Sequence, residues 1–174
     1  TVTHYTKSQL ELIKSLRTQR KEGSLLWYLD RSKTAMGGRQ LRQWLDKPLL
    51  GHDTLLERHN KVDQLLNHYF ERLDIEEALS RVYDLERLVT KISLSKANAR
   101  DLNQLKQSLA QIPYLNQVLK SLNQNHDGKQ DHAFHLLEDF SDLVENIDAC
   151  LKEDPPISIK EGGVIADGYH PQLD

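Results

Sequence analysis

The sequence predicts an all-α protein, an irregular bundle of several helices with a short β-hairpin-like segment near the C-terminal end. Leucine occurs 30 times, against 8 isoleucines and 7 valines, and this bias favours helix over sheet. Apolar residues recur at intervals of three and four through most of the chain, as they do on the buried face of a helix. The 174 residues suffice for one domain, or for one lobe of a larger domain.

The first fifty residues predict two helices joined by a compact turn. The first helix is short, and its apolar face consists of Leu10, Ile13 and Leu16. An apolar turn follows, formed by Leu25, Leu26 and Leu29. Thr34 has the position of an N-cap for a second helix, which is expected to run to about Asp46 because Pro48 and Gly51 follow.

The middle of the chain predicts a series of amphipathic helices. Asp53 is placed to cap a helix that carries apolar residues as far as Phe70, and the spacing from Ile75 to Leu94 predicts one strong helix. Asn98 and Asp101 have the spacing of a capping pair at the start of the next helix, and Pro113 opens another. Residues 123–131 contain no hydrophobic side chain and predict the longest exposed loop.

The last forty residues change character. One helix is predicted from the seam of Leu136, Phe140, Leu143, Ile147 and Leu151, and Asp154-Pro155-Pro156 ends it. Ile157, Ile159, Val164 and Ile165 flank a glycine pair in a hairpin-like pattern. We therefore divide the sequence into a helical part, 1–151, and a tail, 152–174. A further helix is predicted to begin at Pro171, and we expect the chain to be part of a longer protein.

Charge and composition exclude several classes of protein. Residues 1–50 carry a formal charge of +6, residues 51–150 carry −6 and residues 151–174 carry −3. The acidic majority argues against a chain that binds duplex DNA by itself. No run approaches the ~18–20 apolar residues that cross a bilayer, no signal peptide is recognisable, and Cys150 is the single cysteine. We expect a cytoplasmic protein without a membrane partner.

Patterns that would carry catalysis, a cofactor or a metal are missing from the sequence. Gly128-Lys129 lacks the glycine spacing and the hydroxyl of a P-loop. His132 and His135 are expected to be solvated residues at a helix end rather than zinc ligands, because no cysteine joins them. We predict no catalytic, cofactor-binding or metal-binding residue, and hence no enzyme. A helical interaction adaptor stays open as an alternative.

Three segments, in this order, resemble the core (lever) domain of MutS DNA mismatch repair proteins. The first is the leucine-rich turn with Thr-Ala-Met-Gly-Gly-Arg at 34–39 and a Leu-x-x-Trp-Leu run that ends before Pro48. The second is Val-Tyr-Asp-Leu-Glu-Arg-Leu at 82–88, followed by Asn-Ala-Arg-Asp-Leu at 98–102. The third is the Pro-Pro pair at 155–156, followed by Gly-Gly-Val-Ile at 162–165.

The resemblance covers essentially the whole chain and implies the first part of that domain, ending before the clamp. It implies a bacterial parent protein that recognises mismatched duplex DNA, uses ATP and magnesium, and works with a second MutS subunit and a MutL-type protein. The ATP site and the mismatch-reading Phe-x-Glu motif would lie outside this chain. Within the parent, this part would link the connector, the clamp and the ATPase.

Eight packing residues are the candidates for such a linking role. They are Met36, Leu41, Trp44 and Leu45 in the first segment, and Leu85, Leu88, Val89 and Ile92 in the second. Close-packed helices transmit displacement because their interiors deform little. A purely structural role predicts the same residues, so the sequence leaves both roles open.

Overall fold

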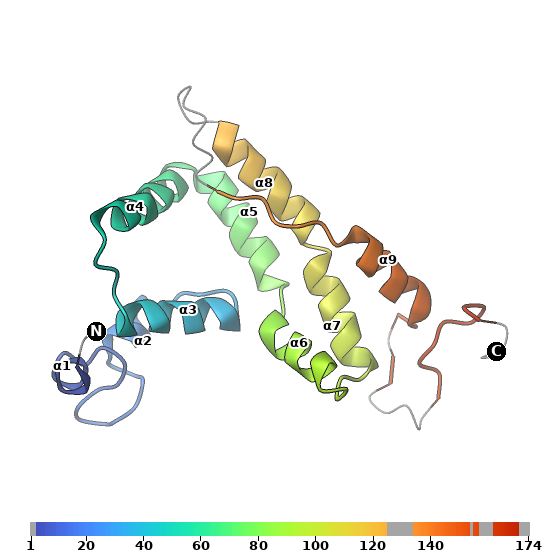
Figure 1. The fold of residues 1–174 in the computed structure, drawn as a ribbon, viewed down its shortest axis with the longest axis horizontal. Helices are drawn as coiled ribbons and strands as arrows, with labels where there is room; N and C mark the ends of the chain where they lie inside the picture. Colours follow the sequence, from blue (N-terminus) through green and yellow to red (C-terminus); the bar gives the residue numbers. More distant parts are fainter. Residues whose placement is uncertain (1–2, 125–133, 154, 157–161, 171–174) are drawn as a thin grey trace. The chain divides into compact units, whose positions relative to one another are not determined.

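The computed structural model describes residues 3–124, 134–153, 155–156 and 162–170. The secondary-structure elements of these residues are α-helices (Figure 1). Among these residues no strand is present, and the all-α prediction is confirmed. The chain forms two compact units, residues 1–67 and 68–174, which we call the N-terminal unit and the C-terminal unit. The predicted division at residue 151 stays a prediction.

The N-terminal unit contains α1 (His4–Gln9), α2 (Leu25–Leu29), α3 (Ala35–Asp46) and α4 (His52–Asn67). The prediction that Leu10, Ile13 and Leu16 share one helix is wrong, because α1 ends at Gln9 and Glu11 has a positive φ of 48°. The chain then turns back, and the backbone N–H groups of Leu25 and Leu26 donate to the carbonyls of Glu11 and Leu12. Asp53 lies in the first turn of α4 rather than before it.

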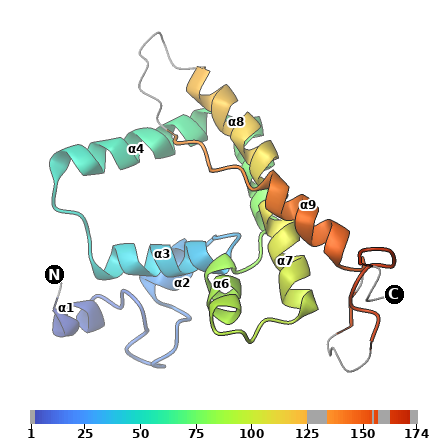
Figure 2. The same cartoon turned by 45° about the vertical axis from the view of Figure 1, so that its right-hand side comes forward.

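The C-terminal unit contains α5 (Tyr69–Ser80), α6 (Leu85–Ser93), α7 (Ala99–Leu109), α8 (Ile112–Gln124) and α9 (Ser141–Cys150). Helix α5 packs along α8, while α7 packs against both α6 and α9 (Figure 2). A single apolar core joins four of these helices to the segment after α9. Its buried members are Leu88, Ala99, Leu105, Leu109, Ile112, Ile147 and Leu151.

The predicted single helix from Ile75 to Leu94 is interrupted, which corrects the sequence-based expectation. Helix α5 ends at Ser80, and α6 begins after Asp84, whose carboxylate accepts from the backbone N–H of Arg87 at 3.3 Å. Between them the backbone N–H of Tyr83 donates to Ser108 Oγ on α7 at 2.9 Å. A long-range hydrogen bond therefore replaces a helical one at this position.

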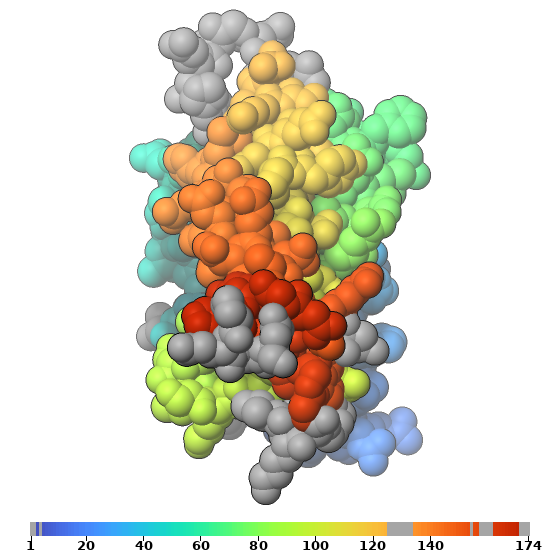
Figure 3. Space-filling model, turned by 90° about the vertical axis from the view of Figure 1, so that its right-hand side faces the viewer, coloured from blue at the N-terminus to red at the C-terminus, as the bar shows by residue number. Residues whose placement is uncertain are grey.

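The predicted helical seam from Leu136 to Leu151 is helical only in its second half, because α9 begins at Ser141. Residues 134–140 are not helical, and two asparagine side chains of α8 hold them. Figure 3 shows the orange atoms of this part of the chain beside the yellow atoms of α8. Asn116 pairs with the backbone of Leu137 through bonds of 2.8 and 2.9 Å, and Asn123 pairs with the backbone of Phe134 through bonds of 2.8 and 3.1 Å. Each asparagine satisfies a backbone donor and acceptor, as a strand partner would.

The C-terminal tail returns to the end of α9. Leu151 and Ile165 form an isolated antiparallel bridge, and the N–H groups of Lys152 and Ala166 donate to the carbonyls of Val164 and Cys150. Gly162 and Gly163 both have positive φ, at 70° and 66°. The predicted apolar positions Ile157 and Ile159, the helix from Pro171 and loop residues 125–131 lie outside the described residues. Among the described residues, no helix is long and apolar enough to cross a bilayer.

Candidate functional site

The first candidate segment folds as predicted at its start. The Thr34 hydroxyl accepts from the backbone N–H of Gly37 at 3.0 Å, so Thr34 is the N-cap of α3. Just upstream, the Asp30 carboxylate accepts from the N–H of Ser32 at 3.2 Å and from Lys21 Nζ at 2.6 Å. The loop before α3 is therefore fixed by side chains close to it in sequence.

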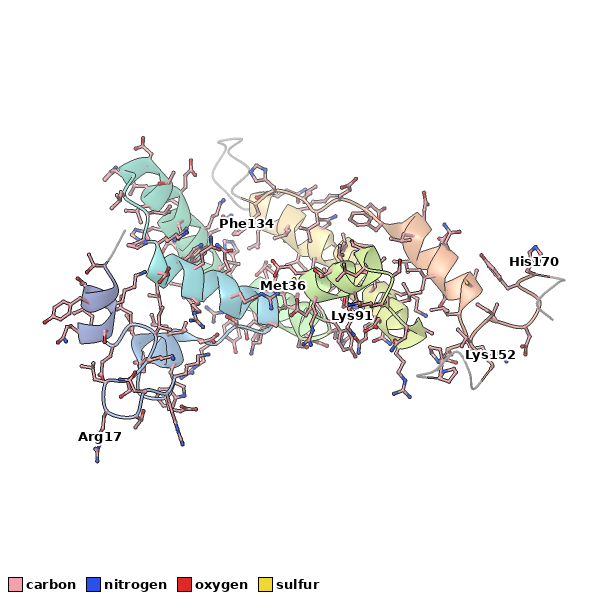
Figure 4. The ribbon with its side chains drawn as sticks, turned by 60° about the horizontal axis from the view of Figure 1, so that its bottom comes forward. Arg17, Met36, Lys91, Phe134, Lys152 and His170 are labelled. Atoms are coloured by element: carbon pink, nitrogen blue, oxygen red, sulfur yellow. The ribbon has the colours of Figure 1, made fainter. Side chains whose placement is uncertain are left out.

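The four packing candidates on α3 are less buried than the sequence predicts. Met36, Leu41 and Leu45 are half-buried, and no residue of α3 is fully buried (Figure 4 labels Met36). Trp44 is 39% exposed, and the guanidinium carbon of Arg58 on α4 lies 3.6 Å from the centre of its ring. The expectation that Trp44 is a core residue is therefore wrong.

We expect Trp44→Ala to lower the free energy of unfolding by only about 1–2 kcal/mol, against ~3–5 kcal/mol for a buried aromatic residue. The variant loses partial burial and the cation–π contact with Arg58. Urea unfolding followed by far-UV circular dichroism measures the difference, with Trp44→Phe as the control that keeps a ring over the guanidinium. A loss above about 3 kcal/mol would place Trp44 in a core.

The second candidate segment, on α6, divides into an inner and an outer edge. Leu88 is 4% exposed and belongs to the core of the C-terminal unit, and Leu85 packs against that core. Val89 and Ile92 are 52% and 37% exposed, so the prediction that all four are buried is wrong for these two. The four residues still share one apolar stripe, but the core covers only one edge of it.

A polar network fixes α6 against the start of α7. The Asp101 Oδ2 atom accepts from the backbone N–H of Asn98 at 3.1 Å, and Asn98 Oδ1 accepts from the N–H of Asp101 at 2.9 Å. The predicted capping pair is therefore confirmed as a reciprocal capping box. The other carboxylate oxygen of Asp101 accepts from Lys91 Nζ of α6 at 2.6 Å (Figure 4 labels Lys91).

The sequence of these helices and of the tail is similar to that of a known protein family. A family model described as MutS domain III matches residues 5–170. The chain belongs to the MutS domain III family. The order of the three segments in the sequence thus identified the family correctly.

Several bacterial MutS proteins are similar to this chain over nearly all of its length. The DNA mismatch repair protein MutS of Bacillus velezensis is 48% identical over 170 residues, which are 98% of this chain and 19% of that protein. The MutS protein of Bacillus subtilis is 46% identical over 170 residues, and that of Listeria monocytogenes is 44% identical over 171. This MutS domain III chain spans about a fifth of the length of the curated relatives that it matches.

Two residues that tie this MutS domain III together are absent from the sequence-based candidates. Ser108 is buried on α7 and connects it to Tyr83, as described above, while its own hydroxyl donates to the carbonyl of Gln104 at 2.7 Å. Arg100 Nε donates to the carbonyl of Pro155 at 3.4 Å and connects α7 with the tail. The local sequence does not reveal either connection, because Tyr83 lies 25 residues from Ser108 and Pro155 lies 55 residues from Arg100.

The side chains that could bind a metal ion are dispersed among the described residues of this MutS domain III. In residues 3–124, 134–153, 155–156 and 162–170, no group of three or more His, Cys, Asp or Glu side chains could hold a metal ion. Cys150 is a half-buried free thiol that packs against the core. His135 is exposed, and His132 lies outside the described residues.

Open pockets do occur in each unit. The C-terminal unit has one of about 640 Å³, lined by residues of α7, α9 and the turn after α5, with both acidic and basic side chains. The N-terminal unit has two, and each is lined by more cations than carboxylates.

Proposed function

We propose that this chain is the mechanical core segment of a MutS-type DNA mismatch repair protein. The observation that carries the proposal is the match to MutS domain III over residues 5–170, with relatives named as DNA mismatch repair proteins. A helical adaptor unrelated to repair, the alternative left open by composition, is not supported by these comparisons.

The activities of the whole parent protein form part of the same proposal. The parent would bind mismatched duplex DNA, use ATP and magnesium, pair with a second MutS subunit and engage a MutL-type protein in the bacterial cytoplasm. The chain itself would be non-catalytic and would connect the connector, clamp and ATPase domains. The names and the bacterial sources of the relatives support this parent.

The inner and outer edges of α6 suggest two roles for this helix: it would stabilise the core of the C-terminal unit, and it would transmit a displacement from another domain. Leu85 and Leu88 face the core, so they would stabilise the unit. Val89 and Ile92 are exposed apolar residues, and we assign to them a contact with another domain of the parent. Because Lys91 and Asp101 join α6 to α7, a push on the outer edge would move both helices together.

A chimaera tests the proposed function. The segment of Bacillus subtilis MutS that matches this chain is replaced by the 174 residues, and the chimaera is expressed in a strain that lacks its own MutS. We expect the spontaneous mutation frequency to fall to near the level given by intact MutS. A chimaera that accumulates as a soluble protein but leaves the frequency at the level of the empty strain would contradict the proposal.

A double variant, Val89→Ser with Ile92→Ser, separates transmission from stability. Since both side chains are exposed, the unfolding free energy of the isolated chain should change by less than about 1 kcal/mol. We expect the same double variant to raise the mutation frequency given by the chimaera. Ser93→Ala, an exposed change on the same helix, is the control and should leave the frequency unaltered. If the double variant instead has a much lower free energy of unfolding than the unmodified 174-residue chain, Val89 and Ile92 have a structural role.

A further inference from the structure

Four large apolar residues are exposed where the chain enters α9. They lie close together in the sequence, and each is between 37% and 47% exposed: Leu136, Leu137, Phe140 and Leu143. The first three precede the helix, and Leu143 lies in its first turn. Figure 3 shows the orange atoms of this part of the chain at the surface that faces the viewer. We call residues 136–145 the entry segment.

Hydrogen bonds from side chains give the backbone of the entry segment a defined path. Asn116 of α8 makes two hydrogen bonds with the backbone of Leu137. Further along, the Asp139 carboxylate accepts from the N–H and from the hydroxyl of Ser141, at 3.0 and 2.6 Å. These bonds hold the pKa of Asp139 below its ordinary value, so it stays ionised at neutral pH. A surface that is ordered beforehand loses less conformational entropy when a partner binds.

The charged residues in and just after the entry segment are all acidic. Residues 134–151 contain five Asp and Glu residues but no Lys or Arg. All five acidic residues are exposed: Glu138, Asp139, Asp142, Glu145 and Asp148. Apolar and acidic residues are therefore interleaved along one short stretch of chain.

Nearby cations offset only part of this negative charge. Lys106 of α7 pairs with Asp148 at 2.7 Å. Lys120 of α8 lines a pocket together with Leu136. Five carboxylates against these two lysines leave a formal charge of −3.

Three of the carboxylates are available for a partner. Within the residues that the structure describes, the side chains of Glu138, Asp142 and Glu145 form no ion pair. Arg81 lines a pocket with Glu145, but it is already paired with Glu77. The negative charge of the entry segment is therefore not neutralised by the described part of the chain.

Two other exposed apolar groups of the C-terminal unit have a different charge pattern. On α5, Arg72 lies between the exposed residues Phe70 and Leu73. On α6, Lys91 lies between the exposed residues Val89 and Ile92. The entry segment differs from both, because it combines exposed apolar residues with charges of a single sign.

We infer that the entry segment is a docking surface for a basic, amphipathic segment of a partner protein. Exposed apolar groups rimmed by polar residues mark interaction sites, and amphipathic segments bind through apolar side chains on one face. The carboxylates determine the sign of the partner, because they attract Lys and Arg and repel acidic segments and nucleic acid. The inference goes beyond the proposed function, since it concerns a partner of this surface rather than the transmission of movement.

The test is fluorescence anisotropy with the full 174-residue chain and a labelled synthetic peptide. The peptide has about 14 residues, in which Lys and Leu recur with the spacing of an amphipathic helix. At ~100 mM salt, where the Debye length is about 10 Å, we expect saturable binding. A peptide with Glu in place of Lys should not bind. A peptide with Ser in place of Leu should bind at least about tenfold more weakly, because it buries little apolar surface.

Matched charge reversals locate the binding on the chain. Glu138→Lys with Glu145→Lys changes one non-helical and one helical residue of the entry segment and should weaken binding at least about tenfold. Glu22→Lys with Glu57→Lys makes the same changes on exposed residues of the N-terminal unit, one non-helical and one on α4. This control should alter the affinity less than about twofold.

A second double variant tests the apolar part of the surface. Leu136→Ser with Leu143→Ser keeps every carboxylate and should also weaken binding at least about tenfold. Far-UV circular dichroism confirms that each variant is folded. The charge reversals lie on exposed side chains, so they keep the test decisive if the serine variant disturbs α9.

Three binding results would overturn the inference: no saturable binding of the Lys and Leu peptide, equal losses in the two charge-reversed chains, or equal affinity for the Ser and Leu peptides. Sedimentation of the chain alone tests the remaining occupant. A dimer that Leu136→Ser with Leu143→Ser dissociates would show that a second copy covers the entry segment, and it would also overturn the inference. None of these results depends on the mutation frequency of the chimaera, so failure here is distinct from failure of the proposed function.

Discussion

Replacing Leu88 by alanine is expected to lower the free energy of unfolding by about 2–5 kcal/mol, the cost of removing three carbons from a packed interior. Leu88 is 4% exposed and is the member of α6 that lies fully within the core shared with α7, α8 and α9. Because α6 is only nine residues long, it depends on this contact rather than on its own helical propensity. Urea unfolding of the full chain, followed by far-UV circular dichroism, measures the loss.

The neighbouring residue provides a matched control for Leu88→Ala. Val89→Ala also truncates an aliphatic side chain on α6, but Val89 is 52% exposed, and alanine has the higher helical propensity. We expect the stability of Val89→Ala to lie within about 0.5 kcal/mol of that of the unmodified chain. Equal losses in the two variants would mean that α6 is rotated about its axis relative to the structure described above.

Two helix starts were predictable from the sequence because the cap and its partner are close together. Thr34 with Gly37, and Asn98 with Asp101, each satisfy a backbone donor three residues away. Such bonds form within a single turn and do not depend on the rest of the fold. The identity of these residues was therefore enough to place the starts of α3 and α7.

Helix interruptions were not predictable, because distant side chains cause them. Apolar spacing continues through residues 81–84, yet the helix breaks where Tyr83 N–H bonds to Ser108. Residues 134–140 keep helical spacing as well, but Asn116 and Asn123 hold them in another path. Periodicity reports which side chains are apolar, and it does not report that a side chain elsewhere supplies the backbone partners.

The candidate packing residues show a related limit. One apolar stripe of the sequence consists of Leu85, Leu88, Val89 and Ile92. Such a stripe is expected whichever surface buries it. The core of this chain covers Leu88 and packs against Leu85, and it leaves Val89 and Ile92 exposed. A stripe in the sequence does not distinguish a partner within the chain from one in another domain.

Loss of the Asp101 carboxylate should have the second large effect on stability. In the unmodified chain one carboxylate oxygen of Asp101 accepts from Lys91 and the other accepts from the backbone N–H of Asn98. Asp101→Asn removes the negative charge and replaces one of these two acceptors by an NH₂ donor. The side chain of Asp101 is 8% exposed, so water replaces these bonds poorly. A hydrogen bond to a charged group contributes ~1.5–3 kcal/mol and the capping bond about 1 kcal/mol, so we expect a total loss of about 2–4 kcal/mol at pH 7.

The same contacts make the effect of Asp101→Asn depend on pH. Burial raises the pKa of the Asp101 carboxyl, but hydrogen bonds from Lys91 and Asn98 and the nearby charges of Lys91 and Arg87 more than offset this effect, so the pKa lies below its ordinary value. A carboxyl whose pKa is lower in the folded state contributes stability above its unfolded pKa and loses it as the pH falls through the folded value. The stability gap between the unmodified chain and Asp101→Asn should therefore be full at neutral pH and should narrow below about pH 4.

Urea titrations of both proteins from pH 7 to about pH 2.5 measure how that gap changes. Glu77→Gln is the control, because Glu77 and Arg81 form an exposed i,i+4 pair whose loss should cost no more than about 0.5 kcal/mol. A gap for Asp101→Asn that stays constant through the acid range would show that the amide, rather than the missing charge, causes the destabilisation. Such a result would contradict the conclusion that the charges of Lys91 and Asp101 stabilise the contact between α6 and α7.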